Sequence, residues 1–206
     1  MQQTIYKHVG KHLMNSIEFN KYWDLNYPES NPIGHELKGV YPNRWLRIHS
    51  LPESKRYAES EDEYQIILDR QNKLISELIG EGTEIIIVSG QYEMELTGEI
   101  STELSDYGEF QKCRTIELHK IYPEEYEDDF FYDVYFRTDI WTTNSQNELL
   151  TKIADDEFRA MFVCPNRNCI VAPYDGGMDI IVDSQEKRDK LKTKYKDWLS
   201  EREDGM

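Results

Sequence analysis

The chain has 206 residues, 38% of them hydrophobic and 31% charged, with a formal net charge of −16 at pH 7. This length suits one domain, no Pro/Gly/Ser-rich linker divides it, and the apolar fraction is sufficient for a core. The acidic balance argues against nucleic acid or an anionic membrane as a direct partner, since phosphate recognition needs clustered Lys and Arg. We therefore expect a single domain over residues 1–206 and a basic protein as its partner.

Residues 91–133 carry thirteen acidic and three basic side chains, a net charge of −10 within the total of −16. Aromatic anchors inside a charged rim are typical of protein interfaces. This composition predicts an acidic, tyrosine-rich insert or projecting region that meets a positively charged protein. The alternative is a solvated loop tip. The residues predicted to bind the partner are Glu124, Glu125, Tyr126, Glu127, Asp128, Asp129, Tyr107 and Tyr122.

The sequence favours a cytoplasmic protein with reduced thiols. Residues 1–15 contain no apolar stretch of signal-peptide length, and no later uncharged apolar run is long enough to span a bilayer. Cys113, Cys164 and Cys169 form a sparse, odd set, unlike an extracellular disulfide framework.

The first half of the chain predicts a helix over 11–23, a strand over 43–51 and a long helix after Ser60. Ser60 with Glu63 three residues later forms a capping box for this long helix, and Gly80 and Gly82 end it. The nearly continuous apolar run 84–89 indicates a central strand covered on both faces.

The second half predicts strands over 115–121 and 130–141, which bracket the acidic region. Two further capping boxes, Ser145 with Glu148 and Asp183 with Glu186, predict a short helix and a final amphipathic helix. Between these helices, strands over 158–163 and 169–172 form a hairpin, and 178–182 forms another strand. The sum is an α+β domain with a mixed, mostly antiparallel sheet of about five or six strands and helices packed on it.

The C-terminal third resembles an uncharacterised bacterial family of small acidic domains. The resemblance rests on a short capped helix, a hairpin, the run Tyr-Asp-Gly-Gly-Met-Asp-Ile-Ile at 174–181, and a helix ending in Tyr-Lys-Asp-Trp-Leu at 195–199. It implies an α+β fold and a bacterial or phage origin. Small acidic proteins of this kind are suspected as immunity proteins beside toxin genes, so the resemblance implies an immunity-protein-like role.

Two groups of residues suggest a pocket. Asp175 and Asp179 flank a Gly-Gly pair, as metal or acid/base chemistry would need; alternatively, the glycines supply positive φ and the aspartates bond the turn backbone. The basic cluster around Arg47 suits an anion or a nucleotide base, or else pairs with nearby acids. The alternative pocket comprises Arg44, Arg47, His49, Tyr174, Asp175 and Asp179.

No metal, cofactor or catalytic constellation is expected. His8 and His12 share a helical face near one end of the sequence, and Cys164 and Cys169 lack the second ligand pair of a zinc site. No Gly-x-Ser-x-Gly elbow occurs. We therefore favour a non-enzymatic protein of immunity or inhibitor type that blocks a basic protein such as a nuclease toxin. The alternative is a small enzyme or ligand-sensing domain that uses the predicted pocket.

Overall fold

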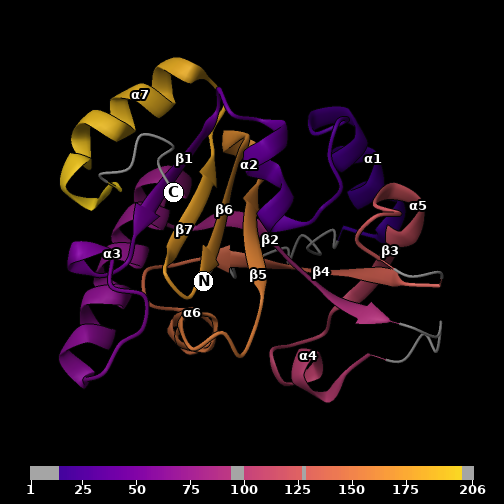
Figure 1. Ribbon diagram of the computed structural model, residues 1–206, viewed down its shortest axis with the longest axis horizontal. Helices are drawn as coiled ribbons and strands as arrows, with labels where there is room; N and C mark the ends of the chain where they lie inside the picture. Colours follow the sequence, from indigo (N-terminus) through magenta and orange to yellow (C-terminus); the bar gives the residue numbers. More distant parts are fainter. Residues whose placement is uncertain (1–13, 94–99, 127–128, 201–206) are drawn as a thin grey trace, which may run out of the picture.

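The protein is an antiparallel sheet covered by helices on both faces (Figure 1). The computed structural model describes residues 14–93, 100–126 and 129–200. Its seven strands follow the order β1-β7-β6-β5-β2-β4-β3, and every neighbouring pair is antiparallel. The predicted α+β class is confirmed, with more strands than the sequence indicated.

The bounds of the elements are as follows. The strands are β1 (Trp45–His49), β2 (Thr83–Glu93), β3 (Gln111–Glu117), β4 (Phe131–Trp141), β5 (Ala160–Cys164), β6 (Cys169–Tyr174) and β7 (Gly177–Ile181). The helices are α1 (Ser16–Asn26), α2 (Leu37–Val40), α3 (Glu61–Ile79), α4 (Thr102–Asp106), α5 (Leu118–Ile121), α6 (Asn147–Ala154) and α7 (Gln185–Lys194). Short 3₁₀ turns lie at η1 (Gly34–Glu36), η2 (Pro52–Ser54), η3 (Pro165–Arg167) and η4 (Lys196–Trp198).

Two hydrophobic cores lie on opposite faces of the sheet. Helices α3, α6 and α7 pack on the face that carries Ile85 and Ile87 of β2. Helices α1, α2 and α5 cover the other face, which carries Ile86 and Val88. Because successive side chains of a strand point to opposite faces, a strand buried on both sides must be apolar throughout. This confirms the prediction for residues 84–89.

Helix α3 begins and ends where the sequence predicts. Ser60 is its N-cap and accepts a hydrogen bond from the backbone N–H of Glu63. Gly80 follows the helix with φ of 90°, a backbone region that glycine enters without steric cost. With 19 residues α3 is the longest helix of the described chain. Within 14–93, 100–126 and 129–200, no helix has the length and apolar content needed to cross a bilayer.

Several predicted boundaries are wrong. Helix α1, predicted over 11–23, runs over Ser16–Asn26. Helix α6 has Gln146 as its N-cap, and Ser145 instead accepts a hydrogen bond from the backbone of Thr142. Helix α7 is capped by Ser184, one residue after the predicted Asp183. The segment 118–121 is helical, so the predicted strand over 115–121 ends at Glu117. Among α5, α6 and α7, only α7 has a side-chain cap, with Ser184 accepting from the Lys187 N–H, while α5 and α6 begin without one. A polar pattern therefore locates a helix end only to within a residue or two.

Much of the acidic region belongs to the sheet. Within 91–133, the structure places the end of β2, all of β3 and the start of β4 in one three-stranded arm. Helices α4 and α5 connect to this arm. Glu127 and Asp128 lie outside the described residues.

Candidate functional site: a cavity in a split sheet

The sheet divides into two arms beyond the start of β5. Strand β2 pairs with β4 along its full length to Glu93, but with β5 only over Ile86–Ser89. Likewise β6 pairs with β7 up to Tyr174, but with β5 only over Cys169–Val171. The outer ends of β2 and β6 therefore continue on either side of the first residues of β5. In Figure 1 the arm of β2 and β4 turns away from β5, β6 and β7.

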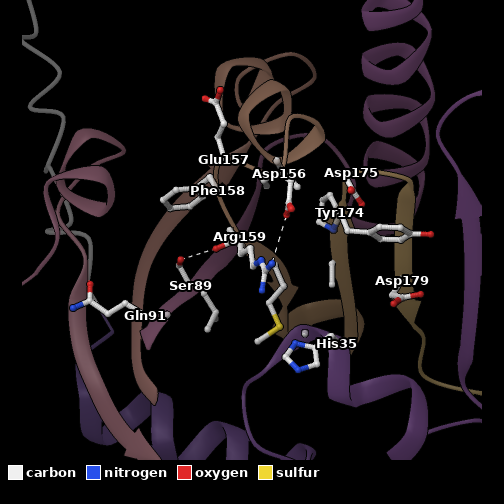
Figure 2. A pocket seen from close by; sticks show the side chains of 18 of the residues that line it. His35, Ser89, Gln91, Asp156, Glu157, Phe158, Arg159, Tyr174, Asp175 and Asp179 are labelled. Carbon is white, nitrogen blue, oxygen red and sulfur yellow. Dashed lines mark hydrogen bonds and ion pairs between the residues drawn. The ribbon is translucent and has the colours of Figure 1, made fainter. Parts of the chain in front are cut away.

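A cavity of about 820 Å³ occupies this split. Its volume lies within the range of small-molecule sites. Val88, Met161 and Ala172 contribute apolar surface, and charged and aromatic side chains converge above them. Figure 2 shows Ser89 and Gln91 on one side, Tyr174 and Asp175 on the other, and Arg159 between them. The polar lining includes His35, Arg47, Arg56, Asp156, Arg159, Tyr174, Asp175 and Asp179.

One wall is fixed by a buried ion pair between β1 and β7. Arg47 donates from Nε and Nη2 to the two carboxylate oxygens of Asp179, each at 2.8 Å. Trp45 Nε1 donates to the same carboxylate at 2.9 Å. The Tyr174 ring lies 4.7 Å from the Arg47 guanidinium, a cation–π contact. Burial raises the pKa of Tyr174 to about 12, with Arg47 acting in the opposite direction. The wall is therefore rigid and presents a neutral phenol.

The β6–β7 turn adds a second ion pair. Asp175 is buried, and its carboxylate accepts from Arg56 Nε at 2.6 Å. The prediction that Gly176 and Gly177 supply positive φ is wrong, because the positive-φ glycines of the described chain are at other positions. A Cβ on Gly177 would instead lie 2.1 Å from the Ile48 carbonyl oxygen. Gly177 is thus required by the close approach of β1 to β7.

The turn before β5 carries the cavity's central cation. Arg159 Nη2 lies 3.6 Å from Asp156 Oδ1, and both side chains are substantially exposed. Exposed pairs at this distance contribute little stability, so the guanidinium remains exchangeable. The backbone of the turn is held elsewhere: Ser89 Oγ donates to the Arg159 carbonyl at 2.6 Å, and the Phe158 ring packs on Tyr107. A firmly anchored backbone therefore presents a loosely paired cation.

His35 lies beneath this cation at η1 (Figure 2). Burial lowers the pKa of His35, and the Arg159 guanidinium and Lys38 ammonium lower it further. Asp179 and Glu125 act in the opposite direction. The imidazole is therefore held toward its neutral form by burial first and by the neighbouring positive charges second.

Two phenols from the other arm complete the aromatic lining. Tyr92 of β2 and Tyr132 of β4 stack edge to face, with ring centroids 5.0 Å apart. Burial raises the pKa of both hydroxyls, and Arg159 opposes this effect in both. The Tyr132 ring lies over Gly90, where a Cβ would come within 2.4 Å of it. The arms thus contribute a phenol surface on one side and the Arg47–Tyr174 wall on the other.

Of the predicted pocket residues, Arg47, Tyr174, Asp175 and Asp179 line the cavity. Arg44 instead packs near Tyr27 and Tyr41 and donates to the Val182 carbonyl. His49 is outside the cavity lining; burial lowers its pKa, assisted by nearby Arg47.

The structure distributes the predicted partner-binding residues over two places. Tyr107 packs against the core on the α3 and α6 side of the sheet. Tyr122 and Tyr126 pack against the opposite core, where Tyr126 stacks on Phe130. Beside this stack, Glu124, Glu125 and Asp129 are exposed.

The cysteines are free thiols. Cys164 and Cys169 face each other at the end of the β5–β6 hairpin, and both are buried. Burial raises the pKa of Cys113 to about 12. In the described part of the chain, no three His, Cys, Asp or Glu side chains gather as metal ligands would. His8 and His12, which share a helical face in the sequence, lie outside the described residues.

His35, Asp156 and Arg159 were missed by sequence reasoning. Arg159 follows the acidic run Asp155-Asp156-Glu157, which reads as a solvated turn. An isolated cation immediately before a buried strand is the available signal, and it is weak. For His35 the local sequence offers no signal, because Arg159, Asp179 and Glu125 act on it from distant parts of the chain.

The fold and the cavity define an α+β domain with a ligand-sized site in a split antiparallel sheet. Residues 33–203 match the family model described as "Domain of unknown function (DUF3885)". The chain belongs to this family, and the matched range contains the cavity residues from His35 to Asp179. No curated protein and no solved structure matches the chain significantly. Membership of an uncharacterised family is thus confirmed, and an immunity role stays a prediction.

Proposed function

We propose that this protein is a ligand-binding domain that holds a small polar molecule in the split of its sheet. The supporting observation is the cavity itself. It combines an apolar floor with the loosely paired Arg159 and the tightly paired Arg47. Small-molecule sites combine such a floor with a few convergent polar groups. Arg47 and Tyr174 are already held by protein contacts, so the wall needs little reordering on binding.

A thermal denaturation screen tests this function. Nucleotides, sugars, sugar phosphates and amino acids are added singly, because a ligand that binds only the native state stabilises it by mass action. At one hundred times its Kd, a ligand adds about 2.7 kcal/mol, or about 5 to 10 °C for a chain of this size. A hit should be lost in Tyr174→Ala and retained in Lys190→Gln, which changes an exposed residue of α7. A flat screen contradicts the proposal.

A second candidate function is favoured by the exposure of Glu124, Glu125 and Asp129 beside the Tyr126–Phe130 stack. We propose that this surface binds a basic protein, as an immunity or inhibitor protein would. Complementary charge chiefly accelerates association and makes it salt-dependent.

The test is affinity capture from the source cell, with the triple variant Glu124→Lys, Glu125→Lys and Asp129→Lys beside the wild type. The expected result is a basic partner that is released by salt and retained poorly by the triple variant. A matched control reverses the charges of Glu61, Asp62 and Glu186 by substitution with Lys; these residues lie at the starts of α3 and α7. If a captured partner binds both triple variants equally, this surface is wrongly chosen.

A further inference from the structure

We propose that Arg159 and His35 bind the phosphate group of a phosphorylated small ligand, whose body occupies the space between the two arms of the sheet. The inference deepens the proposed function and rests on it. It names the chemical group recognised and the side chains that recognise it.

The Arg159 guanidinium lies between the two arms, and its ion pair with Asp156 is long and exposed on both sides. The other arginines of the cavity are held more tightly: Arg47 by two bonds of 2.8 Å, and Arg56 by one of 2.6 Å. A planar guanidinium matches the oxygens of a phosphate. Arg159 is therefore the cation most readily transferred to a ligand.

His35 lies below Arg159 in Figure 2, and the two side chains line the same cavity. Burial and the Arg159 charge both favour a neutral imidazole. A phosphate dianion between the two side chains would reverse that preference and draw a proton onto His35. The protonated ring would then donate a second charge-assisted hydrogen bond to the phosphate. This bond favours a phosphate monoester dianion over a singly charged anion.

The charged groups that act on His35 determine the direction of this coupling. Arg159 and Lys38 oppose its protonation, while Asp179 and Glu125 favour it. Because Asp179 already accepts two bonds from Arg47, its charge is largely compensated. An anion bound beside His35 would thus raise its pKa more strongly than Asp179 does.

The cavity of about 820 Å³ far exceeds a phosphate group, and Tyr92, Tyr132 and Tyr174 line the remainder. These phenols suit a sugar ring or a nucleobase, which offers a flat face and hydroxyl or amide edges. The ligand class is therefore a sugar phosphate or a nucleoside monophosphate.

Two substitutions with opposite expected effects test the phosphate site. Arg159→Gln removes the cation but keeps the backbone carbonyl that Ser89 bonds. Asp156→Asn removes the internal competitor, and Asn accepts the left-handed backbone of this position, where φ is 57°. Lys190→Gln is the charge-matched control on α7. A purely structural role would not predict a gain from one variant and a loss from the other.

The measurement is a pH titration of the His35 imidazole by NMR, assigned with His35→Gln, at several concentrations of inorganic phosphate and constant ionic strength. Phosphate should raise the His35 pKa. The apparent Kd for phosphate should rise at least about tenfold in Arg159→Gln, fall in Asp156→Asn and stay unchanged in Lys190→Gln. Glucose 6-phosphate and adenosine monophosphate, each compared with its uncharged counterpart, then show which body fits.

Two results would overturn the inference. One is a His35 resonance that phosphate leaves unmoved in both wild type and Asp156→Asn. The other is an equal response to acetate, which would assign the site to carboxylates. Stabilisation by uncharged sugars or nucleosides alone would keep the proposed function and remove only the phosphate site. The absence of stabilisation by every compound would remove both.

Discussion

Asp179 of β7 directly faces Arg47 of β1 in the antiparallel register, and the two side chains form a bidentate ion pair across the strands. Only 14% of the arginine and 8% of the aspartate side chain are exposed. The pair thus joins the edge strand of the sheet to its neighbour and fixes one cavity wall. Removing one partner leaves the other charge buried without compensation.

Asp179→Asn should therefore lower the free energy of unfolding by about 3 kcal/mol. The double variant Arg47→Met with Asp179→Leu should recover most of this loss, because an apolar pair of similar volume leaves no stranded charge. Urea denaturation followed by circular dichroism measures both. Glu186→Gln, in an exposed pair on α7, serves as the control and should leave the midpoint unchanged. A small effect of Asp179→Asn would show that the pair is not structurally important.

Gly177→Ala should cost about 2 kcal/mol or more, because its Cβ would overlap the Ile48 carbonyl oxygen and force β1 away from β7. Gly39→Ala in α2 is the matched control. A Cβ there meets no atom of the described chain within 4 Å, and alanine favours a helix over glycine. Equal midpoints for the two variants in chemical denaturation would refute the steric argument.

Stability should fall between pH 7.5 and pH 5.5 through His35 and His49. Burial lowers the pKa of both imidazoles in the folded protein. As pH falls below about 6.5, the unfolded chain takes up these protons first, so unfolding becomes more favourable. The double variant His35→Gln with His49→Gln should lose less stability over this interval. Urea midpoints at the two pH values give the comparison, and an undiminished loss in the double variant would assign the effect to other groups.

Ser60→Ala should destabilise the protein by about 1 kcal/mol, since the hydroxyl caps the first turn of α3. Ser60→Asp should restore stability, because aspartate is an equally good N-cap and its charge suits the helix start. Thermal denaturation of the three proteins decides the matter. If the aspartate variant is as unstable as the alanine variant, the cap is not the cause.

The local elements could be predicted from sequence because their causes are local. Ser60 caps α3 through a residue three positions away, and the run Ile85 to Val88 is apolar because it is covered on both faces. The β5–β6 hairpin was also predicted, and its turn ends at Asn168 in the left-handed region. Each of these signals lies within a few residues of the structure it produces.

The cavity could not be predicted as a whole, because it arises from strand order. His35 and Arg159 line one cavity because of the order of the strands, and the sequence pattern does not say which strands pair. Arg47, Tyr174, Asp175 and Asp179 were found because their chemistry is concentrated in two short segments. The split between β2 and β6 depends on where β5 begins, a boundary that periodicity locates only within a few residues.

The pairing of β1 with β7 also determines when this protein can fold during its synthesis. Arg47 and Asp179 are 132 residues apart in the chain. A growing polypeptide emerges at about 5–20 residues per second, so β1 waits several seconds beside the ribosome without β7, its strand neighbour in the described sheet. Contacts of such long sequence separation slow folding and leave strand edges open to other chains. The nascent chain is therefore most exposed to aggregation before its last third has been made, and chaperones have that interval in which to act.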